Sequence, residues 1–265
     1  MNSPSNPTEP SLLAMDDPRY GRLRRYNVVM GALHALQAIA VIALATAFAL
    51  PVTASFLSGP PGTPAGAPTT LFSVSIAWGV ALFLLLSAAA HWIVASGPVF
   101  GWYRYNLAHK RNYARWIEYS LSSSVMIVLI AMITGISDIA ALVAIFGVNA
   151  SMILFGLLQE KYEEPGGGML PFWLGCIAGV VPWIAIGIYL ASPGSTEEPP
   201  AFVYAIFFSL FLFFNCFAVT QWLQYRRVGK WRDYLYGEST YITLSLVAKS
   251  LLAWQVFAGT LAGGS

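Results

Sequence analysis

The chain has 265 residues, of which 57% are hydrophobic and 10% are charged, and its net charge is +2. Soluble domains carry about 25% charged residues, so this composition indicates a membrane protein. The small net charge, and the lack of a basic stretch interleaved with aromatic residues, exclude a typical nucleic-acid-binding protein.

Long apolar segments follow one another along the chain. A helix needs about 20 apolar residues to cross the hydrocarbon core of a bilayer. We therefore predict an all-α membrane protein, a bundle of seven transmembrane helices, with spans one to seven at residues 28–50, 71–95, 113–134, 139–158, 169–191, 201–225 and 241–262. The Pro- and Ser-rich segment before them, residues 1–24, is expected to be disordered, and residues 25–262 to form the transmembrane domain.

Basic residues show which way the spans run. Of the fourteen Lys and Arg residues, thirteen fall at one end of the predicted bundle: Arg19, Arg22, Arg24, Arg25, Arg104, Lys110, Arg111, Arg115, Lys161, Arg226, Arg227, Lys230 and Arg232. The loops predicted at the other end contain none. The positive-inside rule then places the N-terminus in the cytoplasm and the C-terminus outside, in a multi-pass protein of the cell membrane.

Sequence motifs of enzymes and metal sites are absent. The two cysteines, Cys176 and Cys216, lie in apolar runs without zinc-ligand spacing, and we interpret them as buried hydrophobic side chains. The sequence has no phosphate-binding loop, no metal-ligand cluster and no nucleophile beside a base. We therefore expect neither an enzyme nor a metalloprotein.

A few ionisable residues fall inside the spans, where they are costly and often functional. Glu118 in span three and Lys249 in span seven are fully charged types, whereas His34 and His91 in spans one and two can be neutral. Three other acidic residues lie at predicted span ends, where we expect water nearby: Asp138, Glu160 and Glu238.

Glu118 and Lys249 are expected to lie at similar depths. Glu118 is five residues into its span, a rise of ~8 Å, and Lys249 is eight residues in, a rise of ~12 Å. The lysine side chain leans toward the start of its helix, so the two charges meet if the helices are neighbours. Two interpretations stay open. The pair fixes helix packing, or Lys249 forms a Schiff base with a carbonyl ligand and Glu118 is its counterion.

Sequence stretches around these residues resemble a known family. "SLVAKS" in span seven resembles the retinal-binding lysine region of rhodopsins. Together with "RWIEYSLSSSVMIVLIA" in span three, "NASMILFGLLQEKY" in span four and "VPWIAIGIYL" in span five, it makes the chain similar to heliorhodopsins over all seven spans. The predicted orientation agrees, being opposite to that of ordinary rhodopsins. The resemblance implies a rhodopsin-like bundle that holds all-trans retinal and forms a homodimer.

The resemblance also implies roles for single residues. Lys249 matches the Schiff-base lysine, Glu118 the sole carboxylate counterion, and Ser245 the serine near the Schiff base. His34 and His91 match the histidines of a proton-accepting polar cavity on the cytoplasmic side. The retinal pocket would include Ser123, Ser124, Asn149, Met152, Ile153, Trp183, Phe214 and Gln221.

Each of these roles has an alternative that the residues leave open. The histidines could serve only as hydrogen bonds between helices. Ser123 and Ser124 could bond the backbone of their own helix. Trp183 and Phe214 could be ordinary core aromatics.

The predicted function depends on what surrounds the Schiff base. Outward proton pumps keep a carboxylate eleven residues after the counterion, where this chain has Leu129, and an acid four residues before the lysine, where it has Ser245. Beyond Leu129, span three has no ionisable side chain. We therefore expect a light-sensing photoreceptor with a slow photocycle and an unknown cytoplasmic partner. A light-driven proton or ion transporter, and a retinal-free seven-helix structural or transport protein, remain as alternatives.

Overall fold

The computed structural model describes residues 15–64, 66–191 and 198–261. This part of the chain includes seven helices long and apolar enough to cross a membrane, which confirms the predicted number of spans. They are α2 (Arg19–Leu44), α3 (Ile76–Ala95), α5 (Tyr113–Ile133), α6 (Ile139–Tyr162), α7 (Leu170–Ala191), α8 (Ala201–Tyr225) and α9 (Tyr234–Val256), the last continued by a short π-helix, Phe257–Leu261. The expected disordered segment lies outside the described residues up to residue 14, and its residues 19–24 belong to α2.

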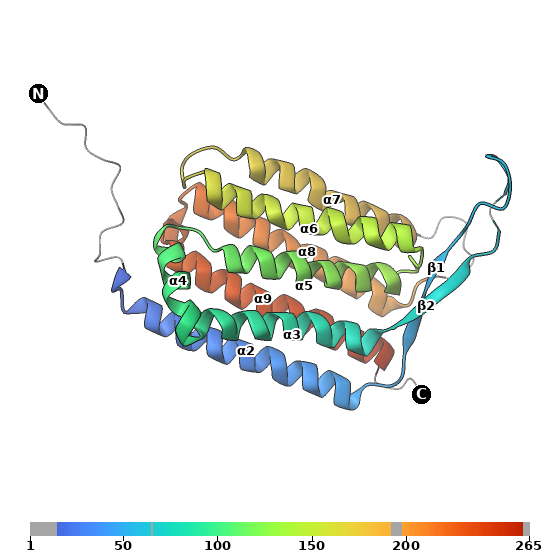
Figure 1. Ribbon diagram of the computed structural model, residues 1–265, viewed down its shortest axis with the longest axis horizontal. Helices are drawn as coiled ribbons and strands as arrows, with labels where there is room; N and C mark the ends of the chain where they lie inside the picture. Colours follow the sequence, from blue (N-terminus) through green and yellow to red (C-terminus); the bar gives the residue numbers. More distant parts are fainter. Residues whose placement is uncertain (1–14, 65, 192–197, 262–265) are drawn as a thin grey trace, which may run out of the picture.

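The seven helices lie side by side in one bundle (Figure 1). Contacts run from α2 to α3, then to α5, α6 and α7, and α8 and α9 close the bundle against α2. The connections rich in Lys and Arg gather at the end where α2, α5 and α9 begin, which we name the basic end. The opposite end carries two strands and is named the hairpin end.

Polar side chains define where several helices begin. Asp17 accepts a hydrogen bond from the backbone N–H of Arg19, and Asn112 accepts one from Arg115. Asp138 caps α6 through the N–H groups of Ala140 and Ala141. Asp233 caps α9 through Leu235. These bonds satisfy donors that a helix start leaves free, so α9 begins at Tyr234, seven residues before the predicted start of span seven.

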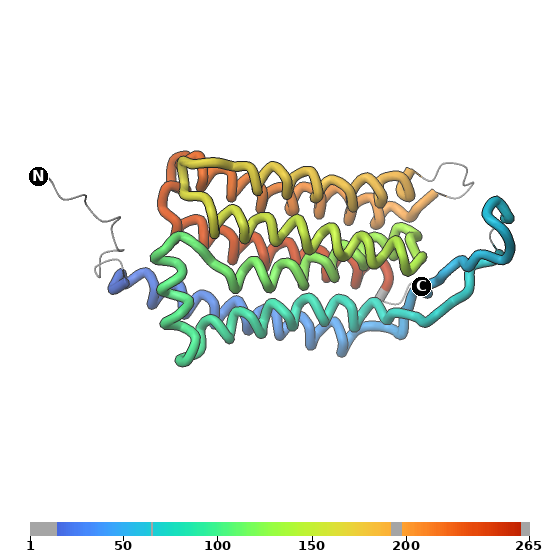
Figure 2. Tube along the Cα trace, turned by 45° about the horizontal axis from the view of Figure 1, so that its top comes forward, coloured from blue at the N-terminus to red at the C-terminus, as the bar shows by residue number. Residues whose placement is uncertain are grey.

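One α-helix among the described residues was not predicted. α4 (Gly97–Ala108) follows α3 directly and lies across the basic end of the bundle (Figure 2). Pro98 in its first turn is compatible with a helix start, and Tyr103, Asn106 and Leu107 face inward. Polar and aromatic residues alternate too closely here for a membrane span, so the sequence was interpreted as a loop.

The loop between spans one and two forms a β-hairpin. β1 (Ala49–Ala54) pairs antiparallel with β2 (Thr69–Ser75), and an irregularity in the register falls between Val52 and Thr53. The hairpin projects beyond the helices (Figures 1 and 2). The predicted end of span one at residue 50 and start of span two at residue 71 were wrong. The apolar and β-branched residues there were assigned to helices, but they form the strands on either side of the loop, and Pro51 lies in one of them.

The core is apolar over the hairpin half of the bundle. Val80, Phe83 and Leu84 of α3 pack there with Ile127 and Ile130 of α5, and all five are fully buried. Many large apolar side chains on the outside of the bundle are exposed and fit a lipid-facing surface. Cys176 is among the exposed residues, so its predicted burial was wrong, and Cys216 is half-buried.

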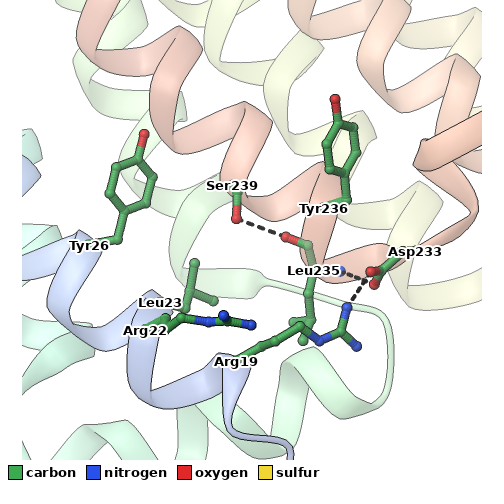
Figure 3. A pocket seen from close by; sticks show the side chains of 8 residues that line it. All are labelled: Arg19, Arg22, Leu23, Tyr26, Asp233, Leu235, Tyr236 and Ser239. Atoms are coloured by element: carbon green, nitrogen blue, oxygen red, sulfur yellow. Dashed lines mark hydrogen bonds and ion pairs between the residues drawn. The ribbon is translucent and has the colours of Figure 1, made fainter.

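An exposed ion-pair cluster joins the starts of α2 and α9 at the basic end. Arg19 pairs with Asp17 at 2.8 Å and also with Asp233. It borders an open groove whose walls include Tyr26, Tyr236 and Ser239 (Figure 3). The Arg19 and Asp233 side chains are 42% and 43% exposed, so water screens the charges. We name Arg19, Asp17 and Asp233 the Arg19 cluster.

Candidate functional site

Lys249 of α9 and Glu118 of α5 form an ion pair inside the bundle. Lys249 Nζ lies 2.9 Å from Glu118 Oε1, and the two side chains are 4% and 9% exposed. Nζ also donates to Ser245 Oγ at 3.0 Å, one turn earlier on α9. Ser87 Oγ of α3 donates to Glu118 Oε1 at 2.6 Å. The pair is balanced in charge, so each group compensates for the loss of water around the other.

An apolar cavity lies beside Lys249, between α5, α6, α8 and α9. We name it the lysine cavity; it is lined by Tyr119, Ser122, Ser123, Met126, Met152, Ile153, Phe214, Phe217, Ser245, Ala248 and Lys249. A second cavity, the α7 cavity, shares four of these residues and reaches Gly175 and Cys176 of α7. The shared residues place the two apolar cavities next to each other.

The structure brings together most of the residues implied for the pocket. Ser123, Met152, Ile153 and Phe214 line the lysine cavity, and Gln221 lines the α7 cavity.

The other three lie behind these walls. Asn149 Nδ2 donates to Ser123 Oγ at 2.9 Å and to Ser124 Oγ at 3.0 Å. Trp183 packs edge-on against Phe214, with ring centroids 5.4 Å apart. Ser123 also donates to the carbonyl of Tyr119, so the back-bonding expected as its alternative does occur.

His34 and His91 stack on one another, with ring centroids 5.6 Å apart. His91 Nδ1 lies 2.7 Å from Asn27 Oδ1 and its ring lines a third cavity, the polar cavity, which also borders Glu118. His34 is fully buried, and neither of its ring nitrogens has a hydrogen-bond partner among the described residues. Of these two histidines, only His91 lines the polar cavity that borders Glu118.

A second buried charge cluster lies toward the basic end, and the sequence analysis missed it. Arg115 of α5 pairs with Glu160 of α6 and with Glu238 of α9. All three side chains are at most 3% exposed, so the expectation that Glu160 and Glu238 lie near water was wrong. We name these three residues the Arg115 cluster.

The predicted helix bounds explain the miss. Span four was expected to end at residue 158 and span seven to begin at 241, which left Glu160 and Glu238 outside the helices. Arg115 precedes Glu118 by three residues and so shares its helix face. That spacing, together with two acidic residues at the same end of the bundle, is the signal that could have revealed the cluster.

Comparisons with known proteins agree with this geometry. The heliorhodopsin family model matches residues 23–261. The chain belongs to the heliorhodopsin family.

Other comparisons address the fold alone. The crystal structure of a light-driven proton pump from Leptosphaeria maculans is similar to the bundle, with a TM-score of 0.60 and 14% sequence identity. The similarity covers 89% of this chain and 94% of the pump. No curated protein sequence matches the chain.

The heliorhodopsin family implies a retinal chromophore. The residues present fit such a ligand. Lys249 lines an apolar cavity that lies next to a second one, and no other lysine among the described residues lines either cavity. Glu118 stands beside its nitrogen, and aromatic side chains such as Phe214 and Phe217 form the walls. An amine, a carboxylate and an apolar channel are what a long aldehyde bound through a lysine requires.

Proposed function

We propose that this heliorhodopsin-family chain is a light-sensing photoreceptor that signals without pumping ions. In this proposal Lys249 carries all-trans retinal as a protonated Schiff base, Glu118 is its counterion, and Ser245 bonds the lysine nitrogen. The supporting observation is the Lys249–Glu118 ion pair at the wall of the lysine cavity. Bound retinal supplies absorption of visible light and a proton on the lysine nitrogen that light makes transferable.

The distribution of polar groups supports a sensor. Ser87 Oγ bonds Glu118, and Asn27 and His91 line the polar cavity beside it, which extends to Asn112 and Glu238 toward the basic end. On the side of the hairpin end, α5 continues through Ile127 and Ile130, which are fully buried and apolar. Beyond Ser124 the described part of α5 offers no ionisable side chain toward the hairpin end, so a proton that reaches Glu118 leaves and returns through the polar cavity. Net transport requires two routes.

We also propose that the basic end is cytoplasmic and that the protein is a homodimer in the cell membrane, with a cytoplasmic signalling partner at the basic end. Thirteen of the fourteen Lys and Arg residues support this orientation. An epitope ahead of Met1 should be protected on intact cells, and one after Ser265 should be labelled. The reverse labelling contradicts the orientation.

Retinal attachment is tested with purified protein and added all-trans retinal. The parent chain and the control Lys161→Ala should acquire a visible absorption band, because Lys161 lies at the end of α6 and away from both apolar cavities. Lys249→Ala should remain colourless. A normal visible band in Lys249→Ala overturns the assignment.

The counterion is tested through colour. Glu118 stabilises positive charge near the lysine nitrogen, and excitation moves that charge away from it. Glu118→Gln should therefore shift absorption to longer wavelength and lose the visible band at a lower pH than the parent. The titration needs a bulky anion that does not bind, because chloride can replace the carboxylate. Unchanged colour and titration mean that Glu118 is not the counterion.

The histidines are tested by single substitutions. His34→Phe and His91→Phe should still form pigment while changing its colour or the rate of its photocycle. If both variants match the parent at every pH, the histidines serve packing alone.

Transport is the alternative function and has a direct test. The pigment should give no sustained photocurrent under voltage clamp. A sustained light-driven current assigns the chain to the transporters instead.

A further inference from the structure

The Arg115 cluster carries an unbalanced charge. One guanidinium faces two carboxylates, so the sum over the three buried side chains is −1. The Lys249–Glu118 pair sums to zero. A single extra charge at membrane depth is costly unless donors surround it or a proton neutralises it. The cluster is therefore a place where one additional proton can be held.

The two carboxylates of the cluster differ in how firmly they are held as anions. Glu160 accepts hydrogen bonds from Asn112 N at 2.8 Å, Trp116 Nε1 at 2.7 Å and Tyr234 Oη at 3.1 Å, as well as the ion pair with Arg115. Besides Arg115, the donors to Glu238 among the described residues are Tyr103 Oη at 2.9 Å and Asn112 Nδ2 at 2.8 Å. Fewer donors favour the charged form less, so Glu238 is the better proton acceptor.

Glu238 also shares a cavity with the photoactive pair. The polar cavity is bordered by Glu118 and His91 at one side and by Tyr103, Arg115 and Glu238 at the other. Glu160 does not line it. A proton that leaves Glu118 into this cavity therefore reaches Glu238 before Glu160.

Side chains between the two carboxylates can pass a proton. Asn27 Nδ2 donates to the carbonyl of Leu23, so its Oδ1 is the atom that faces His91 Nδ1. A carbonyl oxygen only accepts, so His91 carries its hydrogen on Nδ1 and leaves Nε2 free to take a proton. Burial raises the pKa of the Tyr103 hydroxyl well above its ordinary value, so at neutral pH this group keeps its proton and donates to Glu238.

We propose that Glu238 is the residue that stores the proton released in the light, with His91 as the relay and Tyr103 as the last donor. This inference rests on the proposed photoreceptor function. One proton leaves the Lys249 nitrogen for a Glu118 oxygen and passes to His91 Nε2 and the polar cavity. Tyr103 Oη then takes a proton from the cavity as it gives its own to Glu238 Oε1. The charge of the Arg115 cluster changes from −1 to 0, and the proton returns in the dark.

The groups that face Glu238 explain why this change is felt at the basic end. They are Tyr103 from α4, Asn112 before α5, Arg115 from α5 and Glu160 from α6. A neutral Glu238 weakens the pull on Arg115 and on Tyr103. Tyr103 belongs to α4, which lies across the basic end. The position of α4 is thereby coupled to the protonation state of the Lys249–Glu118 pair.

Light-minus-dark infrared difference spectroscopy tests the storage site. The parent should gain a C=O stretching band of a protonated carboxyl group while its visible band is bleached. Glu238→Gln should lose this band, and the surface control Glu164→Gln should keep it. Glu160→Gln should weaken it, because Arg115 then faces Glu238 alone and the extra negative charge is gone. A band that persists in Glu238→Gln, or a parent that bleaches without any such band, overturns the proposal.

Tyr103→Phe gives a second test that keeps the side-chain volume. Loss of the hydroxyl should slow the rise of the carboxyl band at least ~10-fold, toward the range of ~10²–10⁴ for a positioned proton-transfer group. Tyr26→Phe is the matched control, because Tyr26 Oη bonds Thr243 at an exposed position and does not line the polar cavity. An unchanged rate in Tyr103→Phe removes Tyr103 from the path.

The outcomes also separate this inference from the function on which it rests. A parent pigment that shows no light-induced loss of its visible band overturns both. A parent with a normal photocycle and no band that depends on Glu238 overturns only the storage role.

Discussion

Two arginines in this molecule are each held between two carboxylates, one in water and one inside the bundle. Arg19 pairs with Asp17 at the surface, where its side chain is 42% exposed. It also pairs with Asp233 (Figure 3). Arg115 pairs with Glu160 and Glu238, where all three side chains are at most 3% exposed. Both clusters have one positive and two negative side chains, yet only the buried cluster has to compensate for its extra negative charge without water.

The difference shows that burial, more than the identity of the charged groups, decides what a cluster can do. Around Arg19, water and salt screen the extra charge. Around Arg115, hydrogen bonds from Asn112, Trp116, Tyr103 and Tyr234 replace the lost water. A change of protonation therefore has a small electrostatic effect at the surface and a large one in the interior.

The same substitution in both clusters should give the largest contrast. Arg115→Gln leaves two buried carboxylates unpaired and should lower the free energy of unfolding by ~3–5 kcal/mol, or prevent the protein from accumulating. Arg19→Gln should cost less than ~1 kcal/mol. Unfolding of the retinal-free protein in mixed micelles measures both. Equal losses in the two variants mean that burial does not separate the clusters.

A smaller loss is expected at the balanced pair. In the retinal-free protein, Lys249→Met leaves a single carboxylate that can take up one proton, so the cost should be roughly 2–3 kcal/mol. The double variant Lys249→Met with Glu118→Gln should recover most of it, because the buried charge is then gone. A double variant that is less stable than Lys249→Met contradicts this account.

The support around the Arg115 cluster can be disturbed without changing any charge. In Gly156→Ala, the new Cβ would lie 2.5 Å from the Trp116 ring, whose Nε1 bonds Glu160. Overpacking should cost ~1–3 kcal/mol. Gly147→Ala in the same helix has nothing within 4 Å of its Cβ and should be neutral or slightly stabilising. Similar stabilities for the two variants would show that Trp116 moves aside freely.

The smallest effect is expected from pH at the Arg19 cluster. Hydrogen bonds from Arg19 hold the pKa of Asp17 below its ordinary value near 3.8. Because the pKa is lower in the folded state, this stabilisation is present above pH 3.8 and is lost as the pH falls through the folded-state pKa. Asp17→Asn should flatten the pH dependence of stability below pH 4 by less than ~1 kcal/mol. If the variant and the parent have identical pH profiles of stability, Asp17 does not contribute to the pH dependence.

The sequence predicted the seven spans and the similar depths of Glu118 and Lys249, because both follow from local quantities. Hydropathy decides what enters a bilayer, and helical rise fixes the depth of each charge. The Arg115 cluster depends on three helices meeting at one end, and the predicted apolar runs stop short of Glu160 and Glu238. Glu160 and Glu238 were therefore assigned to water, although buried partners extend their helices past them.

The hairpin was missed for a related reason. Ala49 and Leu50, and Leu71, Phe72 and Val74, continue the apolar runs of the neighbouring spans, and composition alone does not separate strand from helix in a short apolar run. Pro51 was the available signal. The strands are otherwise defined by their pairing with each other across the loop at residues 55–68, which hydropathy does not reveal.

The apolar hairpin half of the bundle also decides where a membrane voltage falls. Phe83, Ile127, Ile130 and Leu252 are fully buried between the Lys249–Glu118 pair and the hairpin end, whereas the polar cavity extends toward the basic end. The apolar hairpin half has a low dielectric constant and lies in series with the more polarisable polar cavity, so most of the membrane voltage falls across the apolar half. A full crossing of one charge corresponds to ~2.3 kcal/mol per 100 mV, and a proton moving between Glu118 and Glu238 crosses only a small part of that drop. The proposed proton storage is thus nearly silent electrically, and the resting potential of the cell leaves its dark equilibrium almost unchanged.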